Sequence, residues 1–131
     1  DTNVLLACLF TRGICELLLD VCFVPDATVE VCCSEYILQE FAAAATRFRV
    51  PPERVAEVVE YLRRQILIVE PVPVPADACR DPQDVPVLGK ALAAQAQFLV
   101  TGDQDLLVLG QFDRTTITSP RAFYDFLLAA S

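Results

Sequence analysis

Apolar residues in this chain recur at helical spacing over most segments and collect into short runs between them. Ile14, Leu17, Leu18 and Val21 stand three or four residues apart, the spacing that places side chains on one face of a helix. Comparable stripes predict helices over residues 4–10, 14–23, 35–48 and 52–65, after Asp81, over 103–110, and from 120 onward. The short runs, several of them rich in β-branched residues, predict strands over residues 29–33, 66–69, 98–100 and 115–119.

Strands that alternate with helices are typical of the α/β fold class. We therefore predict a single domain over residues 1–131, a three-layer α/β/α sandwich with a parallel sheet. Pro71, Pro73 and Pro75 predict an extended connector over residues 70–76. We do not interpret this connector as a domain boundary, because neither flanking part could form a core alone.

Residues that favour helix starts precede several of the predicted helices. Ser34 is a suitable N-cap, and Ser119 opens the last helix. Two N-caps are open for the helix after the connector. Asp81 suits the proline that follows it, whereas Asp84 would keep Pro86 from removing a backbone hydrogen bond inside the helix.

The chain is more apolar than most soluble domains, with 54% hydrophobic residues and a mean hydropathy of +0.44. No apolar run approaches the roughly 18 residues needed to cross a membrane. The excess therefore predicts a buried sheet and an apolar subunit interface, as in a homodimer. The first residues lack the basic stretch of a signal peptide, so we expect a cytoplasmic protein that does not enter a membrane.

Charge and residue types exclude several kinds of function. The net charge is −8 and Lys90 is the only lysine, which argues against a basic patch for duplex nucleic acid. The chain has no histidine, which excludes catalysis by a histidine base and zinc sites with histidine ligands. Its six cysteines show no C-x-x-C spacing, and we expect them to be reduced, buried and inert.

Acidic residues stand at both loop ends of one predicted helix–strand unit. These residues are Asp81, Asp84, Asp103 and Asp105, and two further acids with similar placement are Asp1 and Glu40. The ends of neighbouring parallel strands form one crevice, so acids far apart in sequence can meet there. Gathered carboxylates repel one another unless a cation lies among them or some stay protonated. The pattern predicts a divalent metal site; the alternative for Asp81, Asp84 and Asp103 is that they are helix N-caps, where aspartate is favoured.

Four motifs resemble the PIN domain family. In order they are Asp1-Thr2-Asn3-Val4, Ser34-Glu35 through Leu38-Gln39-Glu40, Arg80-Asp81-Pro82-Gln83-Asp84, and Leu99-Val100-Thr101-Gly102-Asp103-Gln104-Asp105-Leu106-Leu107. The chain looks most similar to bacterial members that are toxins of toxin–antitoxin pairs. This resemblance implies a parallel, roughly five-stranded sheet with helices on both faces. It also implies an Mg²⁺- or Mn²⁺-dependent ribonuclease that cleaves single-stranded RNA and is restrained by an antitoxin protein.

The resemblance also implies roles for individual residues. The catalytic and metal-binding acids would be Asp1, Glu40, Asp84 and Asp103. The supporting residues would be Asn3, Thr101, Asp81 and Asp105. Apart from the resemblance, basic residues cluster at Arg47, Arg49, Arg54, Arg63 and Arg64. RNA phosphates could be bound by Arg47, Arg49 and Arg54, whereas Arg63 and Arg64 could equally form a solvated helical face.

Two features depart from the family pattern. An apolar strand normally leads into the first acid, and nothing precedes Asp1 here, so we expect the first strand to be missing from the chain as given. A parent chain would then carry a short Val/Ile/Leu-rich segment before Asp1. Pro86 is unusual beside the third acid and could shift Asp84.

Helix phase separates two glutamates on the helix predicted over residues 35–48. Glu40 falls about 60° from the centre of the apolar stripe and Glu35 lies nearly opposite it, at roughly 100° per residue. We therefore expect Glu40 to point into the crevice and Glu35 to face water.

Two other functions compete with the nuclease. One is a catalytically inactive PIN-like module that binds RNA or protein and does not bind Mn²⁺. The other is a phosphoacceptor receiver domain, which should carry an acceptor aspartate after a mid-chain strand and a lysine near its end; this chain has neither.

Overall fold

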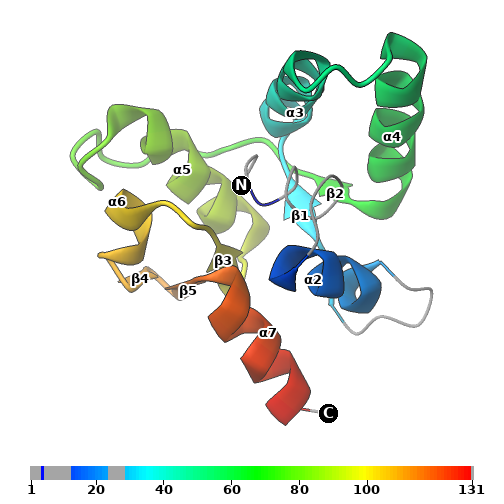
Figure 1. Ribbon diagram of the computed structural model, residues 1–131. Helices are drawn as coiled ribbons and strands as arrows, with labels where there is room; N and C mark the ends of the chain where they lie inside the picture. Colours follow the sequence, from blue (N-terminus) through cyan, green and yellow to red (C-terminus); the bar gives the residue numbers. More distant parts are fainter. Residues whose placement is uncertain (1–3, 5–12, 24–28, 131) are drawn as a thin grey trace.

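The computed structural model of the chain describes residue 4 and residues 13–23 and 29–130. Asp1, Asn3 and nearly all of the helix predicted over residues 4–10 lie outside the described residues. Within them, helices surround two small sheets (Figure 1). The mixture of helices and strands agrees with the α/β class expected from the sequence.

The helices follow the apolar stripes of the sequence. They are α2 (Ile14–Cys22), α3 (Glu35–Arg47), α4 (Pro52–Gln65), α5 (Val85–Ala94), α6 (Gln104–Leu107) and α7 (Pro120–Ala129), with the 3₁₀ turn η1 (Pro82–Asp84) directly before α5. Most bounds lie close to the predicted ones. The exception is α6, which ends three residues before Gly110, where the chain turns with a φ of 69° that glycine tolerates.

The strands form two sheets. β1 (Cys32–Cys33) pairs in parallel with β2 (Leu67–Ile68). The second sheet has the order β3 (Phe98–Val100), β5 (Thr115–Thr118), β4 (Gln111–Phe112). β3 runs parallel to β5 with Leu99 opposite Ile117, whereas β4 runs antiparallel to β5.

This arrangement differs from the single parallel sheet of about five strands implied by the sequence. The described residues form one pair and one mixed triplet of strands. β4 was not predicted, because its two residues are too few to show alternation. It joins β5 through a tight turn at Asp113, with a φ of 53°, so it can only run antiparallel.

Local capping explains where the helices begin. The Ser34 hydroxyl accepts a hydrogen bond from the Ile37 N–H at 3.3 Å, and the Ser119 hydroxyl accepts one from the Ala122 N–H at 3.1 Å. Both N-caps that the sequence left open are used in part: Asp81 caps η1, and Asp84 stands at the N-cap position of α5.

Pro86 does not disrupt α5. It lies in the first turn of that helix, where backbone N–H groups have no intrahelical partner to lose. Its position therefore leaves Asp84 at the helix start.

The proline connector packs against α5 at Gly89. The Val72 N–H donates to the Gly89 carbonyl at 3.2 Å. A Cβ atom at position 89 would lie 2.3 Å from the Val72 carbonyl oxygen, so only glycine permits this approach. The contact brings the chain across α5 before it turns into η1.

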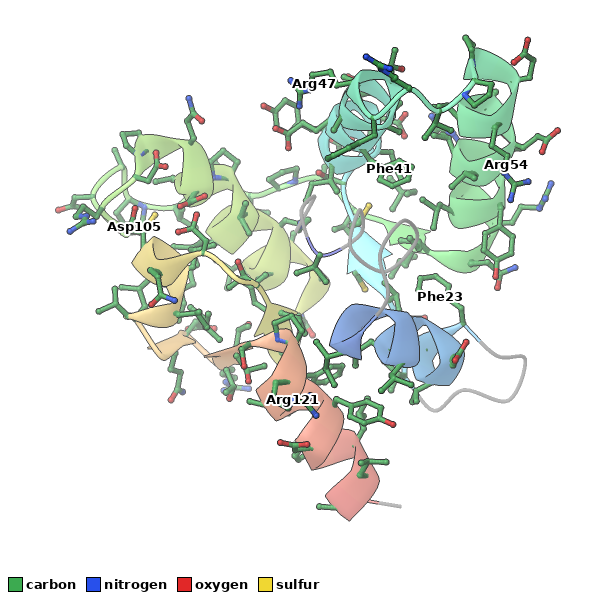
Figure 2. All side chains as sticks on the ribbon, viewed as in Figure 1. Phe23, Phe41, Arg47, Arg54, Asp105 and Arg121 are labelled. Carbon is green, nitrogen blue, oxygen red and sulfur yellow. The ribbon has the colours of Figure 1, made fainter. Side chains whose placement is uncertain are left out.

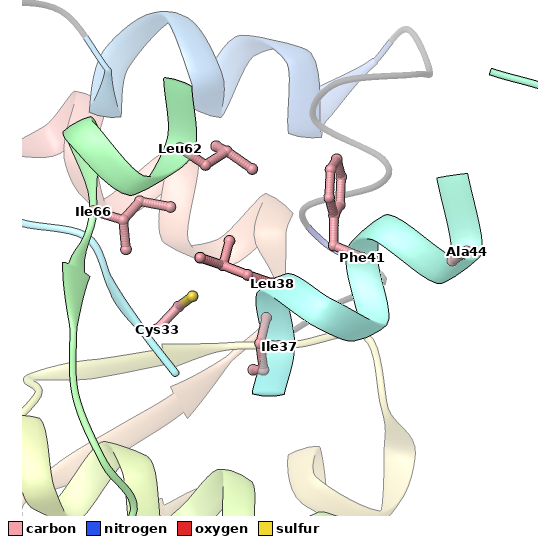
Figure 3. Close-up of a cluster of buried hydrophobic side chains, with 7 residues drawn as sticks. All are labelled: Cys33, Ile37, Leu38, Phe41, Ala44, Leu62 and Ile66. Atoms are coloured by element: carbon pink, nitrogen blue, oxygen red, sulfur yellow. The ribbon is translucent and has the colours of Figure 1, made fainter. Parts of the chain in front are cut away.

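Three apolar clusters hold the parts together, and the smallest of them packs Leu18 of α2 near Phe123 of α7. In the first, Leu38 and Phe41 of α3 point toward Leu62 of α4 (Figure 3). The second joins α5, β3, α6 and β5 through buried Leu88, Leu99, Leu106 and Ile117, together with Cys79 before η1. Because α5 and α6 begin at the end of this second core, it determines where the acids at their starts lie.

The described cysteines agree with the expected reduced state. Cys22, Cys32, Cys33 and Cys79 are free thiols, and burial raises the pKa of each. Among the described helices, none is long and apolar enough to cross a membrane.

A cavity of about 560 Å³ lies between the two sheets. Its walls come from both, with Cys33 of β1 and Leu99 of β3 among them, and from Val4, Lys90 and Phe123. Among the described strands, β1 pairs only with β2, and β3 pairs only with β5. The edges of β1 and β3 are therefore open in the described part of the chain.

Candidate active site

Four aspartates meet where η1 and α6 begin, and we call them the acidic cluster: Asp81, Asp84, Asp103 and Asp105. One carboxylate oxygen each from Asp81, Asp84 and Asp105 lies within 4.8 Å of the other two. Asp103 lies against Asp84, close enough for a hydrogen bond between the two carboxyl groups. Two segments about twenty residues apart in sequence thus share one site.

Helix capping accounts for two of these acids. Asp81 Oδ1 accepts a hydrogen bond from the Gln83 N–H, and Asp103 Oδ1 accepts one from the Asp105 N–H, both at 2.9 Å. Each bond holds its carboxylate at the start of its helix. The alternative interpretation of the acids as caps therefore applies to Asp81 and Asp103.

Asp84 is different, because its side chain makes no capping hydrogen bond. Its Oδ2 atom is buried and has no hydrogen-bond partner among the described residues. Burial is the largest cause that raises the pKa of Asp84 to about 7, followed by the hydrogen bond and charge of Asp103 and the charges of Asp81 and Asp105. Such a group is costly to ionise unless a cation joins it.

Thr101 supports the cluster from the end of β3. Its side chain is fully buried, and its Oγ1 accepts a hydrogen bond from the Asp103 N–H at 3.0 Å. The Thr101 N–H donates to the Thr118 carbonyl at 3.0 Å, which ties this position to β5. The backbone that carries Asp103 is therefore held by the sheet.

Sequence reasoning assigned no role to two neighbours of the cluster. Arg80 places a guanidinium nitrogen 2.8 Å from Asp105 Oδ1, although its side chain is 86% exposed. The Cys79 thiol donates to the Asp81 carbonyl at 3.2 Å. The only feature of the sequence that could have indicated these contacts is that Cys79 and Arg80 are the two residues before Asp81.

Glu40 lies near Lys90, the lysine of α5. Glu40 is exposed on α3, whereas Lys90 is only 6% exposed. Burial lowers the pKa of Lys90, and the negative charge of Glu40 acts in the opposite direction. Among the described residues, the charge of Glu40 thus acts on Lys90. The charges that act on Asp84 are those of Asp81, Asp103 and Asp105.

Glu35 differs from its expected exposure to water. It is half-buried, and both of its carboxylate oxygens accept hydrogen bonds from the Arg63 guanidinium on α4. This pairing lowers the pKa of Glu35. Its role is to link α3 to α4, which the helix phase alone did not indicate.

The arginines considered for RNA binding lie on the α3–α4 hairpin. Arg47, Arg49 and Arg54 are all exposed, and Arg54 pairs with Glu57 at 3.3 Å. In Figure 2, Arg47 and Arg54 lie on that hairpin, well separated from Asp105 beside α6. These arginines and the acidic cluster are therefore on different parts of the molecule.

The acidic cluster fits a hard divalent cation. Its donors are carboxylate oxygens, the ligands that Mg²⁺ and Mn²⁺ prefer. The buried, unpartnered oxygen of Asp84 would gain a partner from such an ion. An α/β fold with clustered carboxylates beyond the end of a parallel strand offers a place where acids can hold a metal for phosphodiester chemistry.

A sequence model described as PIN domain matches residues 1–105, and the chain belongs to that family. The match covers the first three motifs of the resemblance and the fourth as far as Asp105, and PIN domains are generally nucleases. No curated protein and no solved structure matches the chain.

Proposed function

We propose that this chain is an Mg²⁺- or Mn²⁺-dependent endoribonuclease that hydrolyses phosphodiester bonds of single-stranded RNA. The observation that carries the proposal is the carboxyl group of Asp84, which lies among three other acids. Its buried Oδ2 atom has no hydrogen-bond partner among the described residues. Structural N-caps do not need this arrangement. Membership in the PIN family supports a nuclease in particular.

The residues of the chain have distinct roles in this proposal. Asp84 and Asp103 hold the ion together with Asp1 and Glu40, the two acids contributed by other segments. When bound, the ion polarises the phosphodiester and lowers the pKa of a coordinated water. Asp84 gives up its proton as the ion binds, because its pKa of about 7 otherwise keeps it partly protonated at neutral pH.

Other residues keep the acids in place. Thr101 positions the backbone of Asp103 through its hydroxyl group. Asp81 and Asp105 belong to the supporting set, and one carboxylate oxygen of each lies within 4.8 Å of the other and of an Asp84 oxygen. Outer contacts of this kind orient ligands, and their loss typically weakens metal binding about 10- to 100-fold.

The cellular setting follows from the family resemblance. We propose a cytoplasmic toxin of a toxin–antitoxin pair, held inactive by an antitoxin protein and assembled as a homodimer. Exposed apolar side chains, such as Tyr36, Phe48 and Leu128, would suit protein interfaces.

We also propose that the two sheets belong to one sheet, parallel except for β4, whose central strand precedes Asp1. The open edges of β1 and β3 face the cavity of about 560 Å³, and Val4 is part of its wall. A strand placed in this cavity could pair with both open edges.

Calorimetry with Mn²⁺ tests the metal site and separates the nuclease from its main alternative. We expect the wild type to bind Mn²⁺ and Asp84→Asn to bind at least about tenfold more weakly. Asp113→Asn is the matched control, since Asp113 is exposed in the β4–β5 turn and asparagine tolerates its positive φ. A wild type that binds RNA but no Mn²⁺ would favour the catalytically inactive module.

A further inference from the structure

Arg80 is the basic residue that contacts the acidic cluster directly. Its guanidinium lies 2.8 Å from Asp105 Oδ1, and the Arg80 side chain as a whole is 86% exposed. Asp105 is in turn one of the three acids whose oxygens lie within 4.8 Å of one another. The charge of one carboxylate of the cluster, that of Asp105, is thus already neutralised by Arg80.

A divalent ion bound in the acidic cluster would compete with the Arg80 guanidinium for the Asp105 carboxylate. The two cations would also repel each other at such a short distance. An exposed ion pair is worth only about 0.2–1 kcal/mol, so the ion would displace Arg80 at little cost. The long and exposed side chain can then turn outward while its backbone stays before η1.

An RNA phosphate at the metal would meet a strongly acidic surface, because the chain has a net charge of −8. The arginines of the α3–α4 hairpin are well separated from Asp105 in Figure 2. Arg80 is adjacent to Asp81 and carries a planar guanidinium that matches two phosphate oxygens.

We infer that Arg80 is a substrate-positioning residue: its guanidinium rests on Asp105 in the metal-free protein and moves to an RNA phosphate when a divalent ion occupies the acidic cluster. The inference rests on the proposed function and adds to it a residue, Arg80, that binds the RNA phosphate. It also gives Asp105 a second role, as the ion-pair partner of Arg80 in the metal-free protein.

The first measurement is Mn²⁺ affinity by calorimetry. Arg80→Gln removes the competing cation, so it should bind Mn²⁺ about two- to fivefold more tightly than the wild type. In an Asp105→Asn background the same substitution should have no effect, because the contested carboxylate is gone. A gain that persists in that background would overturn the competition between Arg80 and the ion.

The second measurement is the kinetics of RNA cleavage at saturating Mn²⁺. Arg80→Gln should raise KM about tenfold and leave kcat within about threefold, and Arg80→Lys should restore part of the loss. Tighter metal binding together with weaker substrate binding is a pair of changes that a purely structural role would not produce.

Arg121→Gln is the control, because it removes the same charge from an exposed arginine of α7, well separated from Asp105 (Figure 2). If Arg80→Gln and Arg121→Gln behave alike in an active protein, the inference is wrong and the proposed function stands. If the wild type neither binds Mn²⁺ nor cleaves RNA, the proposed function fails and this inference fails with it.

Discussion

At the scale of single residues, the protonation of Asp84 links the acidic cluster to stability. Its pKa is raised to about 7 by burial and by neighbouring acids, above the ordinary value near 4. The folded protein therefore holds a proton between about pH 4 and 7 that the unfolded chain releases. The resulting stabilisation is fully present below about pH 4 and is lost as the pH rises through 7.

The corresponding prediction concerns Asp84→Asn in metal-free protein. Asparagine keeps the shape but cannot ionise, so the variant should gain melting temperature over the wild type at pH 8, on the order of 5 °C. At pH 4, near the ordinary pKa of the carboxyl group, the two should melt within about 1–2 °C of each other. Thermal melts with a chelator at both pH values measure this, and an equal difference at both would show that Asp84 ionises freely.

Lys90 is a second residue whose burial costs free energy of folding, because it carries an ammonium group. Its side chain is nearly inaccessible, and burial lowers the pKa of the ammonium group despite the nearby charge of Glu40. Replacing buried ionic groups by apolar ones of similar volume is often neutral or stabilising by about 1–4 kcal/mol, and Glu40, the acid near Lys90, is exposed and so would not be left as a buried charge. The cavity beside Lys90 gives an apolar replacement room to pack.

We therefore predict that Lys90→Met raises the melting temperature by roughly 4 °C or more at pH 7. Lys90→Arg, which keeps a buried charge, should not. Urea denaturation of the three proteins provides the free energies of unfolding. A clear loss of stability in Lys90→Met would mean that attraction to Glu40 outweighs the cost of burying the ammonium group.

At the scale of elements, α3 carries two glutamates with different partners. Glu40 lies near Lys90 of α5, while Glu35 is held by Arg63 of α4. Only Glu40 belongs to the acids proposed to hold the ion. The Glu35 pair is partly exposed and contributes to the packing of α3 against α4.

This difference predicts opposite outcomes for two matched substitutions. Glu40→Gln should weaken Mn²⁺ binding and abolish most RNA cleavage, with little loss of melting temperature. Glu35→Gln should leave both activities within a few-fold of the wild type and lower the melting temperature slightly. Calorimetry, cleavage assays and melts on both variants measure this. Similar losses of cleavage in both would contradict the assignment of Glu40.

Helices and caps could be predicted from the sequence because their signals are local. Apolar stripes and Ser34 and Ser119 each act within one or two turns of chain. The clustering of Asp84 with Asp103 was also predictable in outline, since both stand at helix starts flanking one strand.

The remaining features depend on contacts between distant segments. The two-residue β4 has no periodic pattern of its own. The pairs Arg63–Glu35 and Arg80–Asp105 join residues 28 and 25 positions apart, and nothing in the sequence selects these partners over others. The burial of Lys90 follows from packing at the cavity, which composition does not indicate.

At the scale of the whole molecule, the cavity separates two sheets whose facing strands have open edges. β1 and β3 each lack a second neighbour among the described strands. An open strand edge favours pairing with another extended segment. The proposed central strand before Asp1 would close both edges and fill apolar space.

This proposal predicts the effect of an N-terminal extension. About five Val/Ile-rich residues added before Asp1 should raise the melting temperature and slow amide exchange at Cys33 and Leu99 at least about tenfold. An equally long Gly/Ser extension is the control. If both extensions leave exchange at these two strands unchanged, the strand does not insert between the sheets.

The claim on which the account depends is that the acidic cluster supports metal-dependent cleavage of RNA. The most direct test is hydrolysis of a fluorescent single-stranded RNA at saturating Mn²⁺, with wild type, Asp103→Asn and Asp113→Asn compared under identical conditions. The account predicts cleavage by the wild type and by Asp113→Asn, none with a chelator, and at least about a hundredfold loss in Asp103→Asn. Cleavage that survives the chelator or the Asp103→Asn substitution would contradict it.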